Sequence, residues 1–187
     1  MNGMKEHPSG TADQSSKVPR IQIGFPTFGR ILIAYDSMQV SKRALSYAAY
    51  ISKISNPEIV VINVIKPSKD LIGVLPLTVK VDLEGNEDQI ELAGRTQVLR
   101  DVLKEMIAMC KAASIPGKIV CNIRIGNPAN EIVHISNLMH FDLIIMGSRR
   151  ISSRIQGVGS TTRKIAATLK VPILIVQVQP RYKDEWQ

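Results

Sequence analysis

The sequence predicts an α/β fold, in which a parallel sheet carries helices on both of its faces. Short apolar runs alternate along the chain with segments whose apolar residues recur at helical spacing, as in parallel sheets with helical crossovers. The run 58–65 (EIVVINVI) is almost entirely apolar, which indicates a strand buried on both faces. Apolar residues make up 44% of the chain and aromatic residues only 4%, so aliphatic side chains must build the core.

The first elements follow a polar N-terminal stretch. Residues 1–28 contain several prolines and few apolar side chains, so we expect a flexible tail before a single domain over 29–179. A strand is predicted over 30–35 (RILIAY), and a helix over 40–54 follows from its apolar spacing. The apolar run described above is the second strand.

The segment 68–94 is irregular and too long for a simple connection. It holds a short apolar piece over 71–77 and an acidic run over 82–91, which contains five acids and no base. We expect a lid, an insertion or a disordered loop in this part of the chain.

Regular elements return after this segment. Residues 95–113 carry a continuous apolar stripe and predict a helix, and 118–125 predict a strand. Asn127-Pro128 is typical of a helix start, with an N-cap followed by proline at the first helical position. Strands over 142–146 and 172–178 flank a last helix over 160–169, and a short C-terminal tail covers 180–187.

The strand–loop–helix block over 142–176 is the strongest functional signal. An apolar strand runs into Gly147-Ser148, and after a basic loop Gly159-Ser160-Thr161-Thr162 opens a helix. Small and hydroxyl residues at a helix N-terminus leave N–H groups that suit a phosphate. The net charge is +8, and most of it comes from the stretch after Gly147, which contains two acidic residues and eight basic ones. The basic residues are Arg149, Arg150, Arg154, Arg163, Lys164, Lys170, Arg181 and Lys183.

Asp36 ends the first predicted strand. Ligands of such folds bind beyond the carboxyl ends of the strands, where the winding direction reverses, so Asp36 is a candidate ligand contact. An equally good interpretation is that its carboxylate caps the following helix.

Other chemistries find little support. No Walker A loop is present, the dinucleotide fingerprint is incomplete at Gly157-Val158-Gly159, and the three histidines show no catalytic or metal-ligand spacing. Cys110 and Cys121 fall in predicted core positions and are expected to be buried, unreactive thiols. No signal peptide or membrane span is evident, which predicts a cytoplasmic protein. Nucleic-acid binding is disfavoured, because no aromatic residues interleave with the bases.

Several segments together resemble the universal stress protein family over about 150 residues, from Arg30 to Val178. They are ILIAYDSMQVSKRAL, VVINVIKP, GNPANEIVHIS, DLIIMGSRR and GSTTRKIAATLKVPILIV, in this order and spacing. The resemblance implies the three-layer, adenine nucleotide alpha-hydrolase-like fold, with a five-stranded parallel sheet in the order 3-2-1-4-5. It also implies homodimerisation through the last strand and, in many members, an ATP site.

The resemblance also assigns site residues. Asp36 and Val64 would contact the base or ribose, Met146, Gly147 and Arg149 would line the loop, and Gly159, Ser160 and Thr161 would hold phosphates. Charge and position add Arg150 and Arg163, which the family pattern does not include. N-capping by Ser160 and Thr161 is an alternative that is compatible with the phosphate role.

The loop departs from the family's Gly-x2-Gly-x9-Gly-Ser/Thr pattern in two ways. Arg150 stands where the second glycine belongs, and 151–158 is one residue shorter than the usual spacer. An arginine where the backbone needs positive φ costs roughly 1–2 kcal/mol. The same guanidinium could instead contact a phosphate.

Three functions therefore compete. The first is a stress protein that binds ATP or AMP as a regulatory ligand, with Mg²⁺ only alongside ATP and at most slow hydrolysis. The second is an interaction module of the same fold with a degenerate pocket and a protein partner. The third, an enzyme of phosphoryl or adenylyl transfer, has the least support, because Asp36 is the only acid near the loop.

Overall fold

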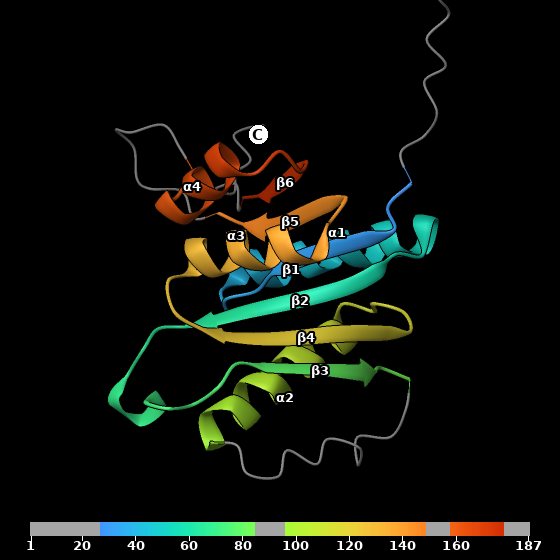
Figure 1. Cartoon of the computed structure of the whole chain (residues 1–187). Coiled ribbons are helices and arrows are strands. Elements are labelled where there is room, and N and C mark those ends of the chain that lie inside the picture. Colours follow the sequence, from blue (N-terminus) through green and yellow to red (C-terminus); the bar gives the residue numbers. More distant parts are fainter. Residues whose placement is uncertain (1–26, 85–95, 149–157, 178–187) are drawn as a thin grey trace, which may run out of the picture.

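Five apolar segments form the parallel part of the sheet in the computed structural model, which describes residues 27–84, 96–148 and 158–177. Their order is β4-β2-β1-β5-β6, which confirms the predicted 3-2-1-4-5 arrangement (Figure 1). Their bounds lie at or close to those expected: β1 (Arg30–Ala34), β2 (Glu58–Ile65), β4 (Lys118–Ile125), β5 (Leu143–Gly147) and β6 (Ile173–Val176).

A sixth strand, β3 (Leu77–Asp82), corrects the prediction of a five-stranded, purely parallel sheet. It pairs antiparallel with β4, with Leu77 opposite Ile123 and Asp82 opposite Lys118. A short 3₁₀ turn, η1 (Lys69–Leu71), precedes it. The described part of the predicted insertion 68–94 therefore extends the sheet, and its remaining residues lie outside the described ranges.

The pattern of β3 differs from that of the parallel strands. Its sequence, LTVKVD, alternates apolar and polar residues, because only one face of this edge strand is covered. The apolar set packs into the core next to α2, and the polar set points to the other face. These sets are Leu77, Val79 and Val81, and Thr78, Lys80 and Asp82.

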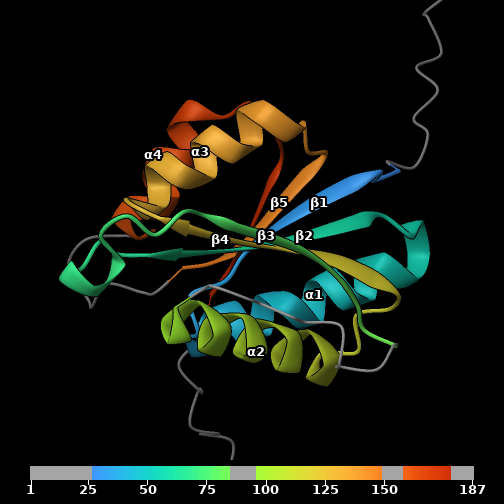
Figure 2. The same ribbon diagram turned by 60° about the horizontal axis from the view of Figure 1, so that its bottom comes forward.

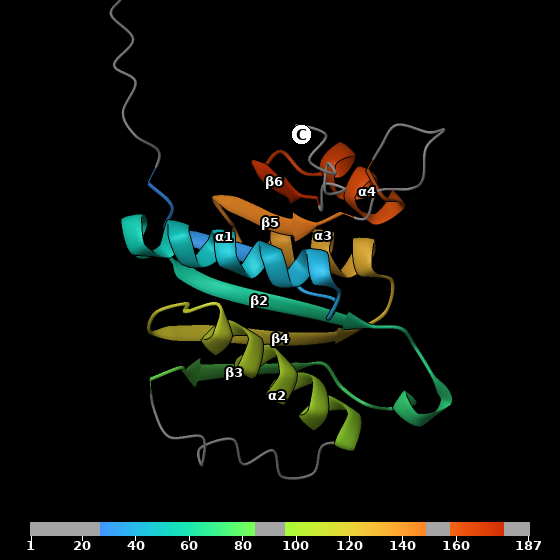
Figure 3. The same ribbon diagram turned by 180° about the vertical axis from the view of Figure 1, so that it is seen from behind.

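Helices cover the sheet on both sides (Figure 2). α1 (Gln39–Ser55) and α2 (Gln97–Ala112) lie on one face, as Figure 3 shows from behind, and α3 (Pro128–Met139) and α4 (Ser160–Thr168) lie on the other. Each face has its own core cluster, one centred on residues such as Ile33, Leu103 and Ile123, the other on Leu32, Ile62 and Ile144. No helix within the described ranges is long and apolar enough to cross a membrane.

Local sequence signals account for two of the helix ends, the start of α3 and the end of α1. Asn127 caps α3 as predicted, because its side-chain oxygen accepts a hydrogen bond from the N–H of Asn130 at 3.2 Å. α1 ends at Asn56, which adopts the left-handed conformation with φ 45°.

Cys110 and Cys121 are buried, as expected, and burial raises the pKa of both thiols, that of Cys121 to about 12.

The winding direction reverses at β1. This strand pairs with β2 on one side and with β5 on the other, so the carboxyl ends of β1 and β5 lie next to each other. The predicted switch point is thereby confirmed, and Asp36 follows one of these ends while Ser148 follows the other. The predicted tails fall outside the described residues, apart from 27–28.

Candidate functional site

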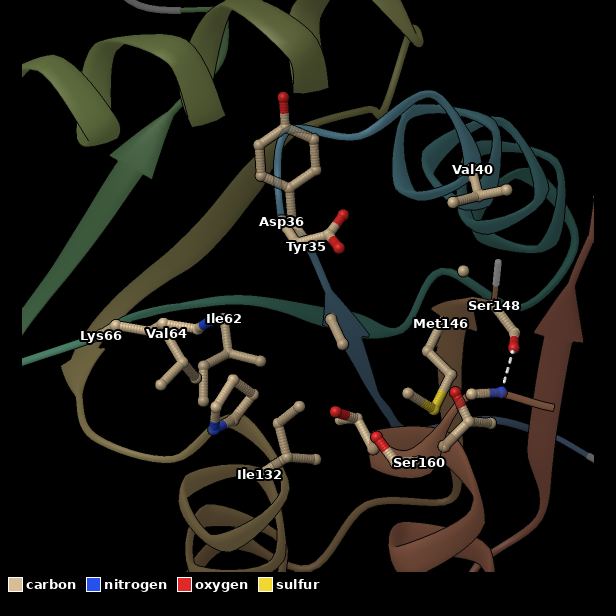
Figure 4. A pocket seen from close by; sticks show the side chains of 16 residues that line it. Tyr35, Asp36, Val40, Ile62, Val64, Lys66, Ile132, Met146, Ser148 and Ser160 are labelled. Carbon is tan, nitrogen blue, oxygen red and sulfur yellow. Dashed lines mark hydrogen bonds between the residues drawn. The ribbon is translucent and has the colours of Figure 1, made fainter. Parts of the chain in front are cut away.

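A cavity of about 620 Å³ opens at the switch point, beyond the carboxyl ends of the strands (Figure 4). Residues after β1 and β5, the end of β2, and the N-terminal turns of α3 and α4 line it. Its volume falls in the range of about 300–1,000 Å³ that is typical of small-molecule sites.

Except for Arg163, the predicted site residues within the described ranges line this cavity. They are Asp36, Val64, Met146, Gly147, Gly159, Ser160 and Thr161. Arg149 and Arg150 lie outside the described residues, so the structure does not place them. Arg163 is exposed and donates a hydrogen bond to the carbonyl of Val158 at 3.4 Å, and it is not among the residues that line the cavity.

The end of β5 requires a glycine for packing. A Cβ at Gly147 would lie 2.8 Å from the backbone N of Ser41 and 2.8 Å from the carbonyl carbon of Val40, both in the first turn of α1. Contacts this short are not tolerated, so Gly147 lets α1 approach the strand closely.

Ser148 links the end of β5 to the start of α4. Its hydroxyl accepts a hydrogen bond from the N–H of Gly159 at 3.0 Å, and its own N–H donates to the carbonyl of Val176 at 2.8 Å. The side chain is buried, with 2% exposed. The N-cap of α4 is therefore fixed against the sheet.

The N-terminus of α4 presents donors to the cavity. The first backbone N–H that bonds within the helix is that of Arg163, which donates to the carbonyl of Gly159 at 2.9 Å. The N–H groups of Ser160, Thr161 and Thr162 come before it and lack partners within the helix. Together with the hydroxyls of these residues and the positive end of the helix dipole, they form an arrangement that suits an anionic group.

Asp36 lies on the other side of the cavity, as Figure 4 shows. Its Oδ1 accepts a hydrogen bond from the N–H of Met38 at 3.2 Å, and its own N–H donates to the hydroxyl of Ser41 at 3.3 Å. The carboxylate thus stabilises the turn before α1, a variant of the capping role expected for it. It remains exposed at the cavity and can accept further hydrogen bonds.

An apolar surface separates these two polar sides. Ile62 and Val64 of β2, Ile132 of α3 and Met146 of β5 contribute it. An apolar wall between an exposed carboxylate and a helix N-terminus can accommodate a ring system that carries both a hydrogen-bond donor and an anionic group.

Lys66 and Tyr35 also line the cavity and were missed by sequence reasoning. Lys66 directly follows the second predicted strand, so the argument that selected Asp36 after the first strand would have found it as well. The hydroxyl of Tyr35 points away from the cavity toward α2 (Figure 4), where it donates a hydrogen bond to Glu105 at 2.8 Å.

Comparison with known proteins identifies the family. The profile of the universal stress protein family matches residues 27–177. The chain belongs to this family. Its fold is accordingly the adenine nucleotide alpha-hydrolase-like fold, with one antiparallel strand added at the edge of the sheet.

Individual relatives are distant. The universal stress protein YxiE of Bacillus subtilis is 28% identical over 159 residues, which cover 80% of this chain and 99% of that protein. A solved universal stress protein in complex with cAMP shares 20% identity and a TM-score of 0.56, over 81% of this chain and 98% of that one. A universal stress protein of Archaeoglobus fulgidus in complex with dAMP shares 14% identity and a TM-score of 0.50, over 79% and 96%.

Asp36 and Lys66 are the acidic and basic side chains at the cavity. Within the described ranges, no group of three or more His, Cys, Asp or Glu side chains could hold a metal ion. The arrangement can recognise an anion, a polar donor and an apolar ring together.

Proposed function

We propose that this universal stress protein binds an adenine nucleotide, ATP or AMP, in the cavity as a regulatory ligand. The observation that carries the proposal is the joint presence of the α4 N-terminus, the apolar wall and the Asp36 carboxylate in one cavity of about 620 Å³. A nucleotide combines the three matching groups: a phosphate, a planar ring, and ribose and amino donors.

Each side of the cavity then has a partner on the ligand. The N–H and hydroxyl groups of Ser160 and Thr161 hold the phosphate, because a helix N-terminus favours negative charge. Val64 and Met146 pack against the base, and Asp36 accepts hydrogen bonds from the ribose hydroxyls or the base amine. The complexes of two solved relatives with cAMP and dAMP support an adenine nucleotide as the ligand class.

Binding rather than turnover is the expected role. Hydrolysis of a phosphoanhydride needs a group that positions the attacking water and a cation that neutralises the developing charge. Mg²⁺ prefers oxygen ligands, and among the described residues that line this cavity Asp36 supplies the single carboxylate. Mg²⁺ would therefore enter with ATP, held mostly by its phosphates, and ATPase activity would be slow.

The direct test looks for nucleotide in the protein as purified. The chain is denatured, and the supernatant is chromatographed against AMP and ATP standards. In parallel, the thermal midpoint is measured with AMP, ATP or GMP at millimolar concentration. Release of adenine nucleotide, or a midpoint raised by AMP or ATP, supports the proposal. No released nucleotide together with no shift would refute it.

Gly159 provides a variant that fills the phosphate end without disturbing the fold. Its φ is −57°, and an added Cβ would meet, among the residues that the structure describes, only the hydroxyl of Ser148, at 3.8 Å. We expect Gly159→Leu to fold normally and to lose the shift caused by AMP. Ala167→Leu, at an exposed position of the same helix, is the matched control and should keep that shift. Retention of the shift in Gly159→Leu would show that the phosphate lies elsewhere.

The alternative of an interaction module remains open because of an exposed flank on α1. Tyr47, Tyr50 and Ile54 recur at helical spacing and are 43%, 67% and 71% exposed. Exposed apolar side chains grouped in this way are typical of protein contacts. The nucleotide assay separates the two functions, since a module with a degenerate pocket shows neither bound nucleotide nor a thermal shift.

We further propose homodimerisation through β6. This strand pairs with β5 on one side, and its residues Ile173–Ile175 are only half-buried. The carbonyls of Pro172 and Val176 accept hydrogen bonds from the β5 side, so the N–H and C=O groups of Ile175 face the opposite side, where no strand of the described residues pairs with β6. An apolar edge with free backbone groups is suited to pairing with a second strand.

The edge can be tested at Ile175. Ile175→Pro removes the outward N–H and leaves the bonds to β5 in place, so we expect a monomer in light scattering after size exclusion. Ile175→Val keeps the N–H and should remain dimeric. A monomeric unaltered protein, or a dimeric Ile175→Pro variant, would contradict pairing through this strand.

A further inference from the structure

Glu105 of α2 holds both neighbours of Asp36. One oxygen of its carboxylate accepts a hydrogen bond from the hydroxyl of Tyr35 at 2.8 Å, and the other accepts one from the hydroxyl of Ser37 at 2.8 Å. Hydrogen bonds to a charged acceptor are stronger than neutral ones. A single side chain from a helix distant in sequence therefore holds the backbone on both sides of the proposed ligand contact.

The side chains of Asp36 and Tyr35 point in different directions. Figure 4 shows the ring of Tyr35 turned toward α2, away from the cavity, while the Asp36 carboxylate lies at the cavity. Tyr35 is 2% exposed, and burial, together with its hydrogen bond to Glu105, raises the pKa of its hydroxyl above the usual value. The hydroxyl thus stays protonated at neutral pH and acts as a constant donor to Glu105.

The turn that carries Asp36 is strained. Ser37 has φ 62°, a left-handed conformation that is uncommon for a residue other than glycine. Strained residues persist only where surrounding contacts hold them, and they concentrate at ligand sites. Here the hydroxyl of Ser37 bonds to Glu105, and the N–H of Met38 bonds to Oδ1 of Asp36 at 3.2 Å.

We propose that Glu105 is a positioning residue, which sets the Asp36 carboxylate for the ligand by holding Tyr35 and Ser37. The identity of the ligand rests on the proposed function, whereas the hydrogen bonds by which Glu105 fixes the turn do not depend on it. The competing explanation is that Glu105 only joins α2 to α1, and Lys42 lies 4.0 Å from the same carboxylate. An exposed pair at this distance contributes little, so the two hydroxyl contacts are the stronger link.

Two substitutions separate these explanations. Glu105→Leu removes both acceptors and keeps a similar volume and a high helix propensity. Glu105→Gln keeps one acceptor oxygen and adds an amide donor that can bond to a hydroxyl oxygen, so it should behave like the unaltered protein. Glu58→Leu is the matched control, because Glu58 also accepts a side-chain hydrogen bond, from Arg30, but lies at the amino ends of the strands.

The first readout needs no ligand. The ¹⁵N order parameters of Ser37 and Met38 are expected to fall from about 0.85 to below about 0.6 in Glu105→Leu, and to stay high in Glu105→Gln and Glu58→Leu. Unchanged order parameters in Glu105→Leu, or the same drop in Glu58→Leu, would overturn the proposal.

The second readout is AMP affinity by calorimetry. We expect Glu105→Leu to bind AMP about five- to tenfold more weakly, and to cause no further loss in an Asp36→Asn background, because the effect passes through Asp36. Equal losses with and without the Asp36 carboxylate would overturn the proposal. If the unaltered protein binds no AMP while the turn loosens in Glu105→Leu, the positioning role stands and the nucleotide proposal alone fails.

Discussion

At Gly147 the backbone of β5 lies against the first turn of α1, with no room for a side chain between them. At Gly159, at the other end of the loop, an added Cβ would make only an ordinary contact among the described residues, 3.8 Å from the hydroxyl of Ser148. The two glycines look alike in the sequence, and the family pattern includes both, Gly147 as part of the loop lining and Gly159 as a phosphate contact. Their surroundings differ, because the first serves helix packing as well and the second serves access to the α4 N-terminus.

Stability measurements should separate these two positions. Gly147→Ala is expected to lower the free energy of unfolding by about 1–3 kcal/mol, because its Cβ would overlap the backbone of Val40 and Ser41. Gly159→Ala should stay within about 0.5 kcal/mol of the unaltered protein. Urea unfolding followed by circular dichroism measures both. Equal stability of the two variants would contradict the close contact between α1 and β5.

Much of the candidate site could be predicted residue by residue, because carboxyl ends of parallel strands share one edge. Asp36, Met146 and Gly159 are each recognisable from their place after a strand or before a helix. Glu105 is not, because its contacts with Tyr35 and Ser37 join segments far apart in the chain. No local pattern carries such information.

Among the secondary-structure elements, α3 and α2 begin differently. Asn127 bonds to the first turn of α3, whereas Thr96, the N-cap of α2, makes no side-chain capping bond. The Thr96 hydroxyl is buried and finds no partner among the described residues. Asn127 and Thr96 are both of a type that favours the N-cap position, but only Asn127 makes the capping hydrogen bond.

Substitution at the two caps should have opposite consequences. Asn127→Ala is expected to lower the free energy of unfolding by about 0.5–2 kcal/mol through loss of the capping bond. Thr96→Val keeps the shape and removes an unsatisfied polar group, so stability should be unchanged or slightly higher. Thermal unfolding of both variants is the measurement. A clear loss in Thr96→Val would show that its hydroxyl has a partner.

The strands show where the spacing of apolar residues is enough to predict a strand from the sequence and where it is not. β2 and β4 have the predicted bounds, because continuous apolar runs between polar turns are unambiguous. The period-two pattern of β3 was present in LTVKVD, but it lay between a turn and an acidic run that together resembled a loop. Its pairing with β4 is a tertiary contact, which decides whether such a short segment becomes a strand.

For the molecule as a whole, buried ionisable groups predict how stability depends on pH. Burial raises the pKa of the Cys110 and Cys121 thiols, that of Cys121 to about 12, while an unfolded thiol titrates near about 8.5. Above that value the unfolded chain loses protons that the folded chain keeps. The contribution of the two thiols to the free energy of unfolding should therefore be constant below about pH 8.5 and fall as the pH rises toward about 12.

Urea unfolding between pH 7 and 11 tests this dependence. Cys121→Ala should be less stable throughout, because it leaves a cavity, but its stability should fall less steeply with pH. In the native protein both thiols should resist alkylation at pH 8. A slope that is unaffected by the substitution would mean that other groups cause the alkaline loss.

The two edges of the sheet differ in chemistry, and this difference bears on how many copies can assemble. The β6 edge, ILIV, is apolar and uncharged, whereas β3 places Lys80 and Asp82 at exposed positions. Charged edge strands resist pairing. Two copies joined through β6 would present β3 at both ends of the combined sheet. Edge-to-edge growth would then stop at the pair, a closed stoichiometry with twofold symmetry instead of an extending ribbon.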